Sequence, residues 1–227
     1  IGNSKREKVE DADDDYYELC KRVDAVLPRH KAFAPTSYYV KVFAIIAISL
    51  GLEGYMHYNR FYAWYLTGTL GFFFALIGLN IQHDANHGAI SRNSVVNRLL
   101  GLTQNWLGGS ALDWIHQHVV QHHINPNDVE QDPDIVGNEL LRFNPLKPLE
   151  NIQAFQHIYL FLLLGLFGIS YIANSVLHNV TRFHLTPVSR LLKSNHMFEL
   201  ATIAFFCARW IVLPLILAPS WSTVLNV

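Results

Sequence analysis

The chain has 227 residues, of which 51% are hydrophobic and only 15% are charged. Its formal net charge is −1, so its charge balance does not indicate a nucleic-acid partner. The two cysteines, Cys20 and Cys207, form neither a disulfide framework nor a paired metal motif. The apolar residues are gathered in long stretches, which is typical of membrane proteins.

The first 37 residues are polar and charged and do not resemble a signal peptide. Three acids, Asp13 to Asp15, precede the segment YYELCKRVDAVL and Pro28, which predicts a short amphipathic helix on the membrane surface. A solvated linker is the alternative. The sequence starts at Ile1 rather than at methionine, so we expect it to be a piece of a longer protein.

Four apolar stretches predict the fold. Two of them carry no charge over 21 and 20 residues, and a helix of about 20 residues spans roughly the 30 Å of a bilayer core. One of the others is interrupted by Arg209, which we expect to contact a substrate headgroup or to extend toward the membrane surface. A buried core helix is the alternative for any single stretch, but four favour an all-α multi-pass membrane protein with four transmembrane helices: Tyr38–Met56, Phe61–Ile81, Ile158–Leu177 and Phe198–Pro219.

The segment Val95–Leu112 is mildly apolar but contains groups that are costly in lipid, namely Asn97, Arg98, Gln104 and Asn105, together with a Gly108-Gly109 pair. We therefore predict an interfacial or re-entrant segment. A full crossing would separate the two histidine blocks that flank it.

With four spans, the N-terminal segment and both histidine blocks share one membrane face. That face carries 12 Lys and Arg residues, 8 in residues 1–41 and 4 in residues 83–151, whereas the other face carries 4. The bias predicts that the histidines face the cytosol. Residues 124–151 are polar and contain four prolines, which predicts a loop.

Five histidines form the candidate metal site: His83 and His87 in QHDANHG, and His118, His122 and His123 in HQHVVQHH. The i, i+4 spacing places both rings of each pair on one helix face. His123 lies about 100° further round an ideal helix, so it points elsewhere unless the helix breaks near Pro126 or it binds a second metal. Five imidazoles exceed one tetrahedral site, and they suit zinc, copper, iron or nickel.

Ligating histidines usually donate their other N–H to a carboxylate or carbonyl, and Asp84, Asn86 and Gln121 are the local candidates. His157 and His116 are weaker candidate ligands. We expect no metal ligand among the remaining histidines. Three of them fall on the opposite membrane face in this topology: His178, His184 and His196. The other two, His30 and His57, are also not expected to bind metal.

Two other classes of function are open to these residues. HDANH is similar to the zinc-protease pattern HExxH, but aspartate is one methylene shorter than the glutamate that activates the zinc-bound water. A metal transporter would need polar residues along its spans, whereas the histidines cluster at the membrane face. Both therefore remain remote alternatives.

At these residues the chain resembles membrane fatty acid desaturases. HDANH is similar to their first histidine box and HVVQHH to their second. Trp114 before the second box, with Asn127 and the Asp132-Pro133-Asp134 run after it, is typical of front-end, Δ5-like desaturases. The resemblance runs from about residue 35 to the end, and it adds Asn127 to the residues expected to support the ligands. It implies a lead-in or linker at 1–37 and a membrane desaturase domain at 38–227, which we expect to be C-terminally incomplete.

The resemblance also implies the chemistry. Two non-haem iron ions held by the five histidines would use O2 and electrons from cytochrome b5 haem and its reductase to insert a cis double bond into a polyunsaturated fatty acyl-CoA or acyl-lipid. The protein would lie in the endoplasmic reticulum membrane, and Trp106 and Trp114 would line the acyl tunnel or anchor the interface. The family's third histidine box and the haem-binding HPGG motif are absent from this sequence, which supports the expectation of a fragment. A sphingolipid desaturase or a lipid hydroxylase on the same scaffold is the alternative.

Overall fold

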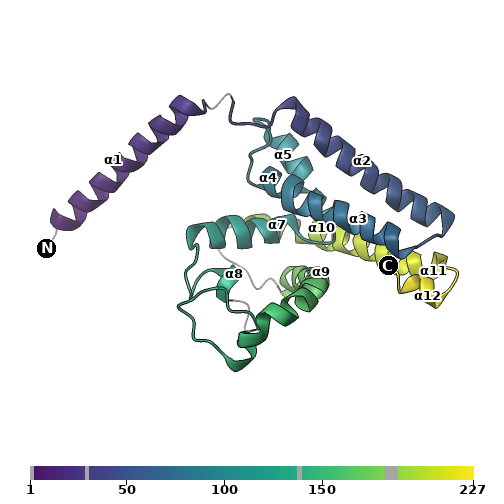
Figure 1. Ribbon diagram of the computed structural model, residues 1–227. Helices are drawn as coiled ribbons and strands as arrows, with labels where there is room; N and C mark the ends of the chain where they lie inside the picture. Colours follow the sequence, from purple (N-terminus) through teal and green to yellow (C-terminus); the bar gives the residue numbers. More distant parts are fainter. Residues whose placement is uncertain (1–2, 29–30, 137–139, 182–188) are drawn as a thin grey trace.

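The computed structural model describes residues 3–28, 31–136, 140–181 and 189–227, without the side chains of 3–13, 189–194 and 196. Every regular element in these ranges is helical (Figure 1). Four helical stretches are long and apolar enough to cross a membrane, and each overlaps one predicted span: Thr36–Asn59, Trp64–Asn86, Asn151–Thr181 and Met197–Leu217. The predicted all-α, four-span fold class is confirmed.

The N-terminal helix α1 (Asn3–Val26) is longer than the sequence predicted, because it begins well before the acidic run Asp13 to Asp15. It ends two residues before Pro28, a residue that cannot continue a helix. Figure 1 shows α1 standing away from the other helices.

The first two spans form a hairpin. Helix α2 (Thr36–Asn59) ends at Arg60, which adopts the left-handed conformation with φ 53°, and the return span is α3 (Trp64–Leu76) with its continuations η1 (Ile77–Ile81) and α4 (Gln82–Asn86). At one end Val42 and Ile45 pack against Ile77 and Ile81. At the other end a second cluster is formed by Met56, Tyr62 and Leu70.

The segment between the histidine blocks folds as short helices rather than as a span, as predicted: α5 (Ser94–Gly101), α6 (Thr103–Trp106) and α7 (Ala111–Trp114). The chain reverses at Gly108, where φ is +92° and a Cβ atom would lie 2.7 Å from the Phe206 ring. Only glycine meets both demands without strain. The tip of this segment therefore packs directly on the last span.

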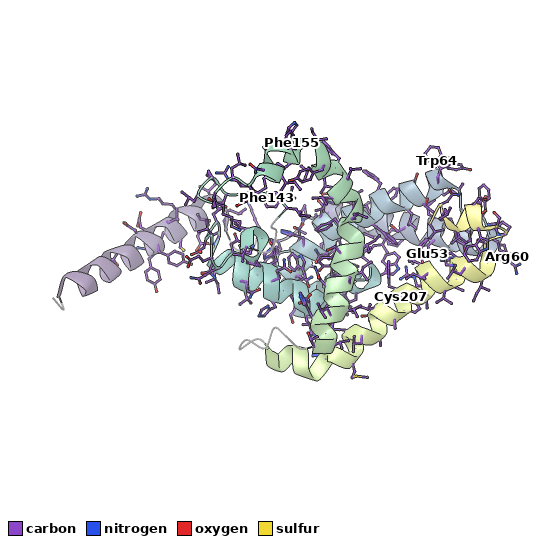
Figure 2. The ribbon with its side chains drawn as sticks, turned by 90° about the horizontal axis from the view of Figure 1, so that it is seen from below. Glu53, Arg60, Trp64, Phe143, Phe155 and Cys207 are labelled. Atoms are coloured by element: carbon purple, nitrogen blue, oxygen red, sulfur yellow. The ribbon has the colours of Figure 1, made fainter. Side chains whose placement is uncertain are left out.

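A buried ion pair joins the first and last spans. The last span consists of α10 (Ser189–Cys207), the π-helix η4 (Ala208–Val212) and α11 (Leu213–Leu217), followed by α12 (Trp221–Val224). The Arg209 guanidinium donates to both carboxylate oxygens of Glu53, at 2.5 and 2.6 Å, and to the Trp106 carbonyl at 3.1 Å. Figure 2 shows Glu53 of α2 beside this last span. The expectation that Arg209 contacts a headgroup or extends to the membrane surface was wrong, since its charge is neutralised inside the helix bundle.

The third span begins as η3 (Asn151–Phe155) and continues as α9 (Gln156–Thr181), which packs on α10 and α7 and crosses the direction of α10 in Figure 2. Near its end the His178 Nδ1 lies 3.0 Å from an Asp113 carboxylate oxygen. Asp113 precedes the second histidine block on the same continuous helix, so the end of the third span contacts the segment that carries this block. The described residues between His123 and the third span form a loop, as the prolines of residues 124–151 predicted. This loop contains one short helix, α8 (Pro133–Val136).

Candidate metal centre

The first histidine block lies on α4, directly after the π-helix η1. The His83 and His87 rings lie on one face, with centroids 4.6 Å apart, as the i, i+4 spacing predicted. The helix stops at Gly88, whose φ is +72°. The Asn97 amide donates to the Gly88 carbonyl at 3.1 Å, which ties this end of α4 to α5.

The second block lies on a π-helix, η2 (Ile115–His122), which continues α7. The His123 N–H bonds to the carbonyl of His118, five residues earlier. In a π-helix the wider turn brings residues four and five positions apart onto nearly the same face. His122 and His123 therefore both lie beside His118, at 5.3 and 4.9 Å between ring centroids. The prediction that His123 points elsewhere assumed an α-helix, and the helix needs no break.

The two blocks meet. The His83 and His118 ring centroids are 5.3 Å apart, and those of His87 and His123 are 4.9 Å apart. Among the described residues, two sets of donor atoms lie within 4.8 Å of one another: His83, His87 and His118, and His118, His122 and Asp134. A full membrane crossing between the blocks is excluded by these contacts.

Trp114 packs against this cluster. Its ring centroid lies 4.5 Å from that of His118, 5.5 Å from His83 and 5.6 Å from His87. The indole therefore packs against three of the five imidazoles. The other predicted tunnel residue, Trp106, lies elsewhere, with its ring against Phe74.

Carboxylates hold two of the histidines at Nδ1. The Asp84 carboxylate lies 3.1 Å from the Nδ1 of His83 and accepts from the Tyr38 hydroxyl of α2 at 2.8 Å. The Asp132 carboxylate oxygens lie 2.9 and 3.0 Å from the Nδ1 of His122. The sequence singled out Asp84, but it gave Asp132 no role and did not single out Tyr38, because contacts between distant segments carry no local signal.

The other residues that the sequence singled out lie around the cluster. The Asn86 amide donates to Gln82, the Gln121 carbonyl accepts from the Asn125 N–H, and the Asn127 N–H donates to Asp132. His157 is exposed, and His57 bonds to the Tyr62 hydroxyl. His30 and His184, and the His196 side chain, lie outside the described residues.

The surroundings shift the pKa of three of these histidines, two downward and one upward. Burial, together with the neighbouring imidazoles, lowers the pKa of His118 to about 4 and also lowers that of His87. The hydrogen bond that His122 donates to the Asp132 carboxylate raises the pKa of His122. Burial opposes ionisation of Asp132, but hydrogen bonds from His122, Asn127 and Asp134 outweigh it and lower its pKa.

The donor set fits a transition metal. Imidazoles converge on one small volume, carboxylates orient two of them, and Asp134 offers a further oxygen. Among the described residues, either of the two sets of donors could hold a metal ion, and both include His118.

Comparison with known proteins now decides the family. The profile for "Fatty acid desaturase" matches residues 59–227, which include both histidine blocks and the last three spans. The chain belongs to the fatty acid desaturase family.

Individual relatives of the chain are desaturases as well. This desaturase chain is 40% identical over 216 residues to an acyl-lipid (7-3)-desaturase of Rebecca salina, covering 93% of the chain and 48% of that protein. It is 38% identical over 221 residues to an acyl-lipid (7-3)-desaturase of Diacronema lutheri, covering 96% and 49%. A probable Delta(5) fatty acid desaturase C of Dictyostelium discoideum is 35% identical over 147 residues, covering 61% and 28%.

The chain spans about half the length of the first two of these relatives. No solved structure matches it.

Proposed function

We propose that the protein containing this chain is a front-end fatty acid desaturase, which inserts a cis double bond into a polyunsaturated acyl chain with O2 and electrons from cytochrome b5. The observation that carries the proposal is the meeting of five histidines from two separate blocks in a chain of this family.

The names of the relatives bear on the substrate. Two are acyl-lipid (7-3)-desaturases and one is a probable Delta(5) desaturase, so acyl-lipid is the substrate class we propose. A (7-3) position competes with the Δ5-like position that the sequence motifs indicate, and acyl-CoA remains an outcome of the test. The excess of Lys and Arg supports a cytosolic orientation of the histidines, in the endoplasmic reticulum membrane.

We assign the binding of two non-haem iron ions to His83, His87, His118, His122 and His123. Bound iron would supply the O2-dependent oxidation that removes two hydrogens from adjacent methylenes, a task for which acid–base side chains alone have too little driving force. Asp84 orients the His83 ring. The packing of Trp114 against three of these imidazoles supports its proposed place beside the acyl chain.

The test is fatty acid methyl-ester profiling of yeast that expresses the complete encoded protein and is fed C18 and C20 polyunsaturated acids one at a time. A new double bond between the existing ones and the carboxyl end is expected. Alanine at any of the five histidines is expected to abolish the product while the protein still reaches the membrane, whereas His157→Ala, at an exposed histidine, is expected to retain it.

An unchanged profile, with the wild-type protein present in the membrane and cytochrome b5 supplied, would contradict the proposal. Hydroxylated lipid or a desaturated sphingoid base would then identify the alternative activities. Normal desaturation by one of the alanine variants would remove that histidine from the ligand set.

A further inference from the structure

The strongest feature outside the histidine blocks is Asp132, in the loop that follows η2. Its side chain is buried, with only 1% of the residue exposed, although carboxylates are rarely buried so deeply without partners. Three donors surround it: the backbone N–H of Asn127 at 2.8 Å, the backbone N–H of Asp134 at 2.9 Å, and the Nδ1 of His122 at 2.9 and 3.0 Å.

This arrangement determines which nitrogen of His122 is free. A carboxylate only accepts hydrogen bonds, so the Nδ1 that faces both Asp132 oxygens carries the proton. The Nε2 is then the nitrogen with a lone pair for a metal. An asparagine at position 132 would have to turn its NH2 toward one of the three donors, which explains why the acid suits this position.

The loop that presents Asp132 is itself tied down. Asn127 adopts the left-handed conformation with φ 63°, which turns its N–H toward Asp132, and its carbonyl accepts from the buried Asn144 amide at 3.1 Å. Further along, the Lys147 ammonium donates to the Ile135 carbonyl at 2.7 Å, which closes the loop around α8. A loop held at several points keeps its carboxylate in one place.

We propose that Asp132 is a positioning residue of the metal centre: it holds the His122 ring so that Nε2 faces the other imidazoles, and Asp132 is therefore needed for full metal affinity. The proposal rests on the metal-binding role proposed above for His122. Asp134 also lies near, with an oxygen 3.3 Å from the same Nδ1, but its side chain is 45% exposed. A metal bound through that Nδ1 would have to displace Asp132.

A purely loop-organising role is the competing explanation, and the same loop offers its control. Asp128 accepts from the backbone N–H groups of Glu130 and Gln131, at 2.8 and 3.0 Å, and these bonds organise the loop without a histidine. Both bonds go to the same Asp128 oxygen, so Asp128→Ala, which removes that oxygen, perturbs the loop while leaving the bonds between His122 and Asp132 in place.

The experiment uses the complete protein, purified in detergent, stripped of metal and titrated with Co²⁺ against a chelator of known affinity. Loss of a carboxylate that orients a ligating histidine typically costs 10–100-fold in metal affinity. We expect Asp132→Asn to lose about 10–100-fold in Co²⁺ affinity and to shift the visible Co²⁺ absorption bands, Asp132→Glu to lose less, and Asp128→Ala to match the wild type within about 2-fold.

Wild-type affinity and spectrum in Asp132→Asn would overturn the inference, and so would an equal loss in Asp128→Ala. A loss in Asp134→Asn as large as in Asp132→Asn would also overturn it, because Asp134 would then be the carboxylate that matters. If Asp132→Asn does not fold, the same Co²⁺ titration of Asp132→Glu replaces it. Wild-type Co²⁺ affinity and absorption bands in Asp132→Glu would then overturn the inference. Because Co²⁺ binding is measured without substrate, failure of the desaturase proposal would appear separately, in the yeast lipid profile.

Discussion

The Glu53–Arg209 pair offers a quantitative test of what joins the re-entrant segment to the spans. Replacing Arg209 by Met removes both ionic hydrogen bonds and leaves the Glu53 carboxylate buried, since only 8% of that residue is exposed. It also removes the donor to the Trp106 carbonyl at the tip of the re-entrant segment.

The expected loss is large for a membrane protein. Breaking a buried ion pair by removing one partner costs about 3–5 kcal/mol, and two hydrogen bonds to charged groups give a loss of the same order. Hydrogen bonds between transmembrane helices average only about 0.6 kcal/mol. We therefore expect Arg209→Met to lower the free energy of unfolding by about 3–5 kcal/mol.

The assay is reversible unfolding in mixed micelles by titration with SDS, applied to the wild type, both single variants and the double variant. Glu53→Leu with Arg209→Met removes both charges, so it is expected to recover most of the loss and retain about 1–3 kcal/mol for the unpaired Trp106 carbonyl. Arg98→Met, at an exposed arginine of α5, is the control and is expected to change little. A loss near 0.6 kcal/mol for Arg209→Met, or additive losses in the double variant, would refute the reasoning.

Two further predictions concern the carboxylates at the histidines. Tyr38→Phe removes the hydroxyl that holds Asp84 and should weaken Co²⁺ affinity severalfold, whereas Tyr39→Phe, whose hydroxyl bonds only to a backbone carbonyl, should not; equal affinities of the two variants would contradict this. Without metal, the free energy of unfolding of the wild type should exceed that of Asp132→Asn most between pH 3.8 and pH 6.5. These limits are the ordinary pKa values of an aspartate and a histidine side chain. Since the His122 pKa is raised, its contribution is lost as pH rises through that raised pKa, and since the Asp132 pKa is lowered, its contribution is lost as pH falls through that lowered pKa. Thermal melting across this range measures the difference, and a pH-independent difference would contradict the pairing.

The sequence by itself determined the spans and the two histidine blocks, because both depend on short-range patterns. A run of about 20 apolar residues must span or be buried wherever it lies, and i, i+4 spacing places His83 beside His87 in any helix. The polar residues and paired glycines of Val95–Leu112 likewise excluded a lipid-exposed crossing, because their unpaired polar groups would be too costly in hydrocarbon.

Only the tertiary structure decided how these parts act together. A π-helix cannot be distinguished from an α-helix by residue spacing, so the orientation of His123 required the backbone itself. Glu53 and Arg209 are 156 positions apart, and Tyr38 and Asp84 are 46 apart. Side chains so distant in the sequence meet only because the helices pack in one particular way. Asp132 lies against His122 instead of in solvent because hydrogen bonds fold the loop after the π-helix back onto it.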